Sequence, residues 1–316
     1  MSPAATNYNP SRFAGHHNDS FFTIHYSFIL PSSRWPAFVL QWKKTERRGS
    51  TVIYTVSFFL LSLALAIGLP LLCSFSLWWA IPLFLGAELV LHVLFVFLNW
   101  LPVRKVDRSK PLERQLPGGM PGVRRIDSLL CAYGGLIPRL TGVEKLPKTP
   151  YLLVCNHRSF YDPLMILHFL KGENLAFVSK PSNLAIPMIG DIAYAAGFLP
   201  IDRENDRNAL KTILAAADYL KRGMCSMCIF PEGTRSRTGR MGDFHPGSFK
   251  IAQRAGVPLV IACVRDTEKA SRRFFLRPTK VYLDILEVLP AEKVKAMSTR
   301  ELADYSKGRM LEVLGE

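Results

Sequence analysis

The sequence predicts an α/β fold preceded by a pair of apolar helices that enter a membrane. Residues 49–103 contain no Lys or Arg and a single carboxylate, Glu88, so this stretch is long and apolar enough for two membrane crossings. Beyond residue 122, strand-like and helix-like segments alternate along the chain, which is the pattern of α/β domains. The chain has 316 residues, and its hydrophobic content of 49% exceeds what a disordered protein carries, so we expect a packed core.

The first 48 residues differ from both parts. Residues 1–20 are polar and lack the features of a secretory signal, so we expect a disordered tail. Residues 21–42 are aromatic and apolar but are interrupted by Pro31 and Pro36, which suits a membrane surface better than a crossing. A basic run at 43–48 then leads into the apolar stretch.

The apolar stretch predicts a helical hairpin over residues 49–103. The segments 51–72 and 77–100 each have about the 20 residues that a crossing requires. The turn at 73–76 is uncharged, whereas basic residues flank the hairpin on both outer sides. The positive-inside rule therefore places both flanks, and with them the soluble domain, in the cytoplasm.

Glu88 and His92 are an acidic and a basic side chain inside the hairpin. They are four residues apart and share one face of a helix. Ionisable groups in a membrane are costly and often functional, so the pair suggests a centre for transport or scaffolding. The simpler interpretation is a pair that satisfies itself between the two helices, and two helices are too few to enclose a pathway.

A linker over residues 104–122 ends in the turn-rich run L-P-G-G-M-P-G, and the α/β domain follows over 123–316. The last predicted helix opens at Ser298, which has capping-box spacing to Glu301. The patterning predicts strands at 151–155, 175–178, 198–201, 225–230, 259–264 and 280–289, and helices at 163–170, 208–221 and 248–255.

The six cysteines lie mostly in apolar runs, which indicates reduced thiols and a cytoplasmic domain. Cys225 and Cys228 form a single C-x-x-C, but a structural zinc site normally requires a second pair. We interpret both as buried strand residues, and we predict neither a metal site nor a bound cofactor.

His157 and Asp162 follow the first predicted strand of this domain. The block N-H-R-S-F-Y-D-P at 156–163 places His157 at the carboxyl end of that strand, where α/β sheets bind ligands. Histidine can accept a proton from a hydroxyl when a partner such as Asp162 holds the ring. Taken alone, Asp162 before Pro163 also fits a helix N-cap, and so short a motif often occurs by chance.

Two further turns carry residues suited to an anion. The block G-F-L-P-I-D-R at 197–203 ends in Arg203, and F-P-E-G-T-R-S at 230–236 supplies Gly233 and Arg235. Arginine binds phosphate oxygens through its planar fork, and glycine allows backbone amides to approach a ligand. Each arginine taken alone also fits an exposed loop residue.

These blocks, with V-P-L-V-I at 257–261, resemble the glycerolipid acyltransferases of the 1-acylglycerol-3-phosphate acyltransferase family. The resemblance covers residues 146–288, and it implies a glycerolipid-acyltransferase-like domain with a mixed sheet flanked by helices. It also implies transfer of a fatty acyl chain from acyl-CoA or acyl-carrier protein, as co-substrate, to the sn-2 hydroxyl of lysophosphatidic acid, giving phosphatidic acid. No acyl-enzyme is expected, and the sequence has no G-x-S-x-G nucleophile motif.

Carried over by position, the resemblance makes His157 the base and Asp162 the group that orients it. It assigns acceptor binding to the residues Lys180, Arg203, Glu232, Gly233, Thr234 and Arg235. The chain departs from the family after Lys180, where Pro181 and Ser182 replace Glu-Leu, and at His245, where a Lys or Arg is common and which we expect to be exposed.

The net charge of +15 indicates an anionic partner, and membrane lipids, phosphorylated substrates and nucleic acid all qualify. Two alternatives stay open: an acyltransferase acting on glycerol 3-phosphate or another lysophospholipid, and a non-enzymatic basic binding protein. The second rests on charge alone, so we expect lipid partners and no nucleic acid.

Overall fold

The computed structural model describes residues 35–74, 76–236, 240–272 and 278–315. The chain divides into two compact units, Met1–Ser50 and Thr51–Glu316. The tail predicted for residues 1–20 and the start of the segment predicted to lie on a membrane surface fall outside the described residues.

The predicted hairpin is confirmed as two apolar helices. Helix α1 (Trp35–Leu72) and helix α2 (Ala80–Trp100) are separated by a turn and a short 3₁₀ segment, Leu77–Trp79. Within them, Tyr54–Leu72 and Ala80–Val103 are long and apolar enough to cross a membrane. Many of their large apolar side chains are exposed, for example Leu72 at 83% and Leu89 at 66%. An apolar surface of this extent suits a lipid environment.

Polar side chains of helix α2 contact helices α3 (Gly119–Tyr133) and α6 (Ile189–Ala195) of the α/β domain. His92 Nδ1 lies 3.4 Å from Glu88 Oε2, and its Nε2 lies 2.7 Å from the hydroxyl of Tyr133 in helix α3. At the end of α2, Trp100 Nε1 donates to Asp191 Oδ2 at 2.8 Å. Glu88 and His92 therefore do contact each other, as expected, but the pair also joins the hairpin to α3.

The sheet has seven strands in the order β1-β7-β6-β2-β5-β3-β4. Every neighbouring pair is parallel except β6 and β7, so the sheet is mixed, as the resemblance implies. Because β6, β2, β5, β3 and β4 run in one direction, their carboxyl ends meet at one edge. The strands are β1 (Leu136–Thr141), β2 (Leu152–Cys155), β3 (Leu175–Ser179), β4 (Leu199–Pro200), β5 (Ser226–Ile229), β6 (Leu259–Arg265) and β7 (Thr279–Leu289).

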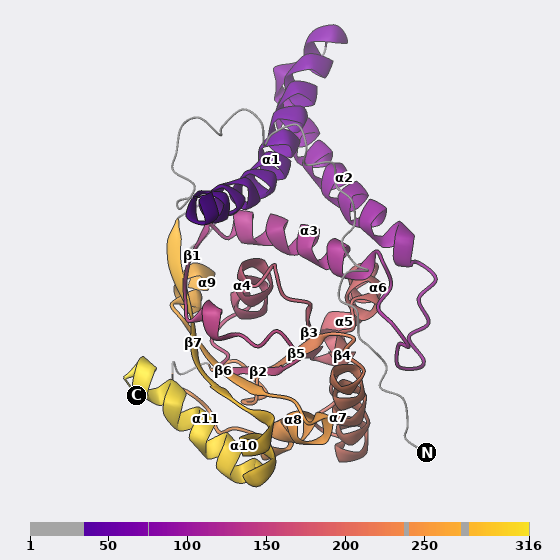
Figure 1. The fold of residues 1–316 in the computed structure, drawn as a ribbon. Helices are drawn as coiled ribbons and strands as arrows, with labels where there is room; N and C mark the ends of the chain where they lie inside the picture. The colour runs from indigo at the N-terminus through magenta and orange to yellow at the C-terminus, as the bar shows by residue number, and fades with distance from the viewer. Residues whose placement is uncertain (1–34, 75, 237–239, 273–277, 316) are drawn as a thin grey trace. The chain divides into compact units, whose positions relative to one another are not determined.

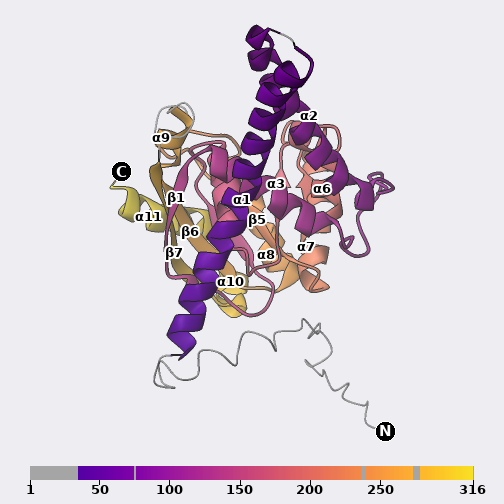
Figure 2. The same ribbon diagram turned by 90° about the horizontal axis from the view of Figure 1, so that it is seen from above.

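Helices cover both faces of this sheet (Figure 1). The remaining helices are α4 (Tyr161–Phe169), α5 (Pro181–Leu184), α6 (Ile189–Ala195), α7 (Asp206–Lys221), α8 (Lys250–Ala255), α9 (Thr267–Arg272), α10 (Ala291–Ala296) and α11 (Thr299–Leu314), with 3₁₀ turns at Leu101–Val103, Val143–Lys145 and Pro246–Phe249. Helices α7, α8, α10 and α11 lie on one face, and α3 and α4 on the other. Figure 2 shows α3 and α6 beside α2.

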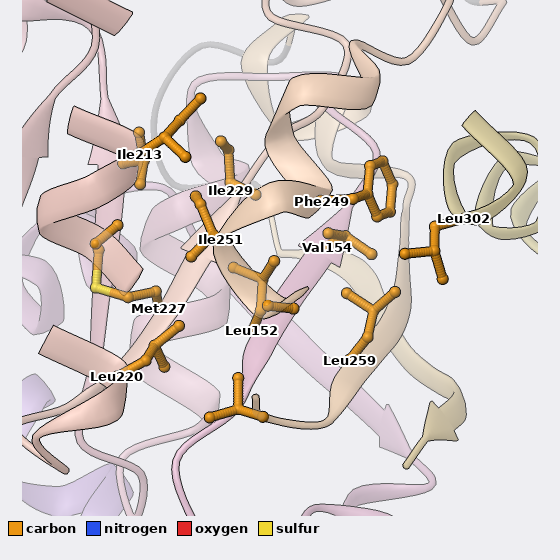
Figure 3. Packing of buried hydrophobic residues seen from close by; sticks show 14 of the residues in the cluster. Leu152, Val154, Ile213, Leu220, Met227, Ile229, Phe249, Ile251, Leu259 and Leu302 are labelled. Carbon is orange, nitrogen blue, oxygen red and sulfur yellow. The ribbon is translucent and has the colours of Figure 1, made fainter. Parts of the chain in front are cut away.

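The core has two layers because successive strand residues point to opposite faces of the sheet. Leu152 and Val154 of β2 pack in one cluster, which Figure 3 shows together with Leu220 of α7 and Leu302 of α11. Leu153 belongs to the second cluster on the other face. A strand buried on both faces reads as a continuous apolar run, which is the pattern that predicted it.

The predicted strands and long helices are all present, and the capping box at Ser298 and Glu301 is confirmed. Cys225 and Cys228 are buried and free, Cys228 in β5 and Cys225 just before it. Strand β1 and the helices α3, α5, α6, α9 and α10 were not predicted. Helix α3 begins inside the predicted linker: a methyl group on Gly119 would lie 2.4 Å from the Ala195 carbonyl carbon, so this glycine lets α3 pack closely against α6.

Candidate active site

His157 follows β2 in a turn that a buried side chain holds in place. The Asn156 amide donates to the Val264 carbonyl at 3.0 Å and accepts from the Val264 N–H at 2.7 Å. These two bonds join the end of β2 to the end of β6 where the strands separate. His157 is thereby fixed at the carboxyl edge of the sheet, where its sequence position predicted it.

Asp162 is fully buried and accepts hydrogen bonds through both of its carboxylate oxygens. Its Oδ2 accepts from His157 Nδ1 at 2.7 Å and from the backbone N–H groups of Arg158 at 2.6 Å and Ser159 at 2.7 Å. Its Oδ1 accepts from the Thr267 hydroxyl at 2.5 Å. Since Oδ2 faces two N–H donors, it must also accept from His157, which leaves Nε2 of the ring as the proton acceptor.

Asp162 is not the N-cap residue of α4, so the N-cap interpretation is wrong. The N-cap of α4 is Phe160, which makes no side-chain capping bond, and Asp162 lies inside the first turn. The carboxylate turns back to the strand end and holds the loop 157–159 instead. The side chain therefore serves the histidine and its turn.

The orientation of the His157 ring is fixed by a contact on its face in addition to the hydrogen bond at its edge. It stacks on Phe230, with the ring centroids 4.2 Å apart and the planes at 15°. The side chain retains 18% exposure, so the imidazole is mostly enclosed but still reachable. Carboxylate and stacked ring together restrict the imidazole to one orientation.

The loop after β5 binds the backbone of His157 on both sides. Glu232 Oε1 accepts from the His157 N–H at 2.6 Å, and the Ser236 N–H donates to the His157 carbonyl at 2.9 Å. The second oxygen of Glu232 accepts from the Gly242 N–H at 2.9 Å. Burial raises the pKa of Glu232, and the bonds from Gly242 and His157 partly offset this effect.

Gly233 lies next to the side chains of Arg203 and His245. Its φ of +80° favours glycine, and a methyl group here would lie 3.0 Å from both Arg203 Nη1 and His245 Nε2. Arg203 is exposed as a whole residue, and partial burial of its guanidinium lowers its pKa. His245 is exposed, as expected, but its ring faces the same glycine as Arg203.

The other predicted binding residues lie in exposed positions at this edge. Thr234 and Arg235 follow Gly233 in the loop after β5. Lys180 follows β3 and precedes α5 as its N-cap residue, without a capping bond from its side chain. The structure therefore places Asp162 and Glu232 in direct contact with His157, and Arg203 beside Gly233. The side chains of Lys180, Thr234 and Arg235 remain open to solvent.

Several residues that build the site were not predicted. Thr267 lies far along the chain from Asp162, in a segment without a motif, so no local signal marks it. Asn156 and Phe230 belong to the quoted blocks, but their roles depend on which strands are neighbours. Within the described ranges, the three-residue group suited to a metal is Asp127, Cys131 and His168, separate from the residues above.

Comparisons with known proteins assign this chain to a family. The family model described as Acyltransferase matches residues 138–265, which include His157, Arg203 and Glu232. A 1-acyl-sn-glycerol-3-phosphate acyltransferase of Salmonella typhimurium is 33% identical over 168 residues, covering 52% of this chain and 67% of the relative. The Escherichia coli enzyme of the same name is 30% identical over 165 residues, again covering 52% of this chain and 67% of the relative.

A chloroplastic 1-acyl-sn-glycerol-3-phosphate acyltransferase of Brassica napus is 37% identical over 132 residues, but these cover 41% of this chain and 38% of that protein. The chain thus spans little more than a third of this plant relative and about two thirds of the bacterial ones. The crystal structure of the lysophosphatidic acid acyltransferase of Thermotoga maritima has the same fold, with a TM-score of 0.51 and 20% identity over 85% of this chain and 97% of that one. The chain belongs to the 1-acyl-sn-glycerol-3-phosphate acyltransferase family.

Proposed function

We propose that this protein transfers a fatty acyl chain from an acyl thioester to the sn-2 hydroxyl of 1-acylglycerol 3-phosphate, forming phosphatidic acid. The observation that carries the proposal is the His157–Asp162 contact of 2.7 Å, in which Asp162 holds Nδ1 and leaves Nε2 as the base. The names of the relatives supply the acceptor class.

The reaction follows from this arrangement. Nε2 of His157 takes the proton of the acceptor hydroxyl while the oxygen attacks the thioester carbonyl carbon. Asp162 stabilises the imidazolium that forms. When the tetrahedral intermediate collapses, the carbon–sulfur bond breaks and the thiolate takes the proton from Nε2. The products are the new ester and the free thiol, and His157 returns to its starting state.

Arg203 and His245 are the groups that we assign to the acceptor phosphate. Both approach Gly233, which has no side chain to keep a phosphate from the backbone. Arg203 supplies a fixed positive charge with a planar fork of donors. Lys180 and Arg235, both exposed at the same edge of the sheet, add positive charge that attracts anionic lipid and donor.

Glu232 acts in this proposal as a positioning residue. Its two oxygens accept from the backbone N–H groups of His157 and Gly242, and a carboxylate repels phosphate. The resemblance assigned it to the acceptor, but the bond to His157 favours a role in holding the base.

The hairpin keeps the site at the bilayer, where the acceptor resides. The basic residues on both outer flanks favour a cytoplasmic domain under the positive-inside rule. Acyl-CoA or acyl-carrier protein would reach the site from that side, and the basic surface attracts either phosphorylated carrier.

The experiment is acyl transfer by the purified full-length protein in detergent. Acceptors are 1-acylglycerol 3-phosphate, glycerol 3-phosphate and neutral lysophospholipids, each with acyl-CoA and with acyl-carrier protein as donor. The proposal predicts the highest kcat/KM for 1-acylglycerol 3-phosphate. Higher kcat/KM with glycerol 3-phosphate or with a neutral lysophospholipid would contradict the assigned acceptor.

Arg203→Ala tests the phosphate assignment in the same assay. Loss of hydrogen bonds to a charged group costs about 1.5–3 kcal/mol, so the acceptor KM should rise about 10- to 100-fold. Arg207→Ala, an exposed arginine at the start of α7, is the matched control and should leave KM unchanged. An unchanged KM in Arg203→Ala would remove this residue from the binding site.

A further inference from the structure

Helices α3 and α4 bury a cluster of three side chains that the acyl-transfer chemistry does not use. Asp127 and Cys131 lie four residues apart on α3, so they share one face of the helix, and they are 2% and 3% exposed. His168 lies in the last turn of α4 and is partly buried. One ligand atom from each residue lies within 4.8 Å of the other two.

Two of the polar atoms in this cluster lack a hydrogen bond. In the part of the chain that the structure describes, neither Asp127 Oδ2 nor His168 Nδ1 has a hydrogen-bond partner, although both are buried. They face each other at 3.6 Å, which is too long for a hydrogen bond. The other carboxylate oxygen, Oδ1, accepts a weak contact from Cys131 Sγ at 3.7 Å. Buried polar atoms are normally paired, so these two atoms require an explanation.

An ion pair between Asp127 and His168 does not provide it. Burial raises the pKa of the Asp127 carboxyl well above its usual range and lowers the pKa of His168 to about 4. Lys171 acts in both cases to lower the pKa, but for Asp127 its effect is smaller than that of burial. Burial also raises the pKa of the Cys131 thiol. Burial of Asp127 and His168 therefore disfavours a charged pair.

We propose that Asp127, Cys131 and His168 form a zinc site. A thiolate, an imidazole nitrogen and a carboxylate oxygen are the ligands that zinc takes, whereas magnesium and calcium take oxygens. In a tetrahedral site with ordinary zinc bond lengths, neighbouring ligand atoms are about 3.5 Å apart. Asp127 Oδ2 lies 3.6 Å from His168 Nδ1, and Asp127 Oδ1 lies 3.7 Å from Cys131 Sγ, so each oxygen is close to this spacing from one of the other two ligands.

Charge balance supports the assignment. A Zn²⁺ ion with one thiolate and one carboxylate has no net charge, so the assembly suits a buried position better than any one charged member. Binding requires the thiolate form of Cys131, whose proton is released to solvent. The fourth zinc position is left to water or to the second oxygen of Asp127, as in sites with three protein ligands.

The position of the cluster indicates a structural role. Helix α4 carries Asp162 in its first turn, and α3 carries Tyr133, which bonds His92 of the hairpin. A zinc ion would cross-link these two helices without touching the reacting atoms. Zinc should therefore raise the thermal stability of the protein.

The test is metal binding by the untagged full-length protein in detergent. Zinc content is measured by mass spectrometry after equilibrium dialysis against micromolar Zn²⁺, and Co²⁺ replaces zinc for spectroscopy. The proposal predicts about one zinc per chain. With Co²⁺ we expect a thiolate-to-cobalt charge-transfer band.

The variants Asp127→Asn, Cys131→Ser and His168→Gln should each lose the bound zinc, and Cys131→Ser should also lose the charge-transfer band. Cys73→Ser removes an exposed thiol of the hairpin and should keep both. Size-exclusion chromatography and circular dichroism show which variants fold. If a variant does not fold, the zinc content and the cobalt band of the wild type still decide the matter. Wild-type protein without zinc under these conditions, or folded variants that retain it, would overturn the proposal.

Discussion

Replacing Asp162 by asparagine separates the charge of the carboxylate from its hydrogen bonds. An asparagine oxygen at the position of Oδ2 can accept from His157 Nδ1 and from the N–H groups of Arg158 and Ser159, as the aspartate does. The amide nitrogen then faces the Thr267 hydroxyl, which can turn to accept instead of donate. The ring orientation should survive, and the negative charge is lost.

The size of the effect follows from the geometry. The imidazolium and the carboxylate would have charge centres about 4 Å apart, which corresponds to about 4 kcal/mol at an effective dielectric constant of 20. One decade in rate corresponds to about 1.4 kcal/mol, so we expect kcat to fall about 10³-fold. The acceptor KM should change little, because Asp162 is fully buried and does not touch the substrate.

The assay is transfer of a radiolabelled acyl group to phosphatidic acid under saturating substrate, together with thermal unfolding. Asp162→Ala is the contrasting variant, because it removes the acceptor of the part-buried Arg158 N–H and of the buried Ser159 N–H and should also lower the melting temperature. Thr267→Ser retains the hydroxyl and is the matched control. A folded Asp162→Asn protein with kcat within tenfold of the wild type would refute the electrostatic reasoning.

Three further predictions concern the surroundings of the site. Gly233→Ala should raise the acceptor KM and lower stability by about 1–2 kcal/mol, because φ is +80° and the methyl group crowds Arg203. The control Gly308→Ala, at a position with open space and no positive φ, should change neither KM nor stability in this way. Burial raises the pKa of Glu232 above 4.5. The free energy of unfolding of the wild type should therefore fall relative to that of Glu232→Gln as pH rises from 4.5 through the raised pKa. The same pH dependence of this free energy in both proteins would contradict the prediction. Tyr133→Phe removes the partner of His92 Nε2 and should cost about 1 kcal/mol in unfolding experiments in detergent, and an unchanged melting temperature would count against this link.

The strands and long helices were predictable because their apolar patterns are local. Strand β2 is buried on both faces and appears as the run 151–155, and the hairpin appears as an uninterrupted apolar stretch. Strand β1 was missed because Pro138 and Arg139 break its apolar pattern. Helix α3 was missed because Gly119 and Pro121 resemble a turn, although proline costs little in a first helical turn and Gly119 serves close packing against α6.

The candidate site was predictable to the extent that its residues follow strand ends. His157 lies in the loop after β2 and Asp162 in the first turn of α4, so the six consecutive residues 157–162 contain the pair. The support around them comes from distant segments: Thr267 bonds Asp162, and Glu232 bonds the His157 backbone. Which strand ends lie together depends on the strand order, and a single sequence does not state it. The role of Glu232 in positioning became visible only with that order.

The most direct test of the central claim is phosphatidic acid formation by the wild type and by His157→Ala, each purified at full length and assayed with 1-acylglycerol 3-phosphate. Deletion of the imidazole removes the base while Asp162 retains its bonds from Arg158, Ser159 and Thr267, so the variant should stay folded. We predict product from the wild type and a loss of at least about 10³-fold in kcat for the variant. Comparable turnover by the folded variant would contradict the assignment of His157 as the base.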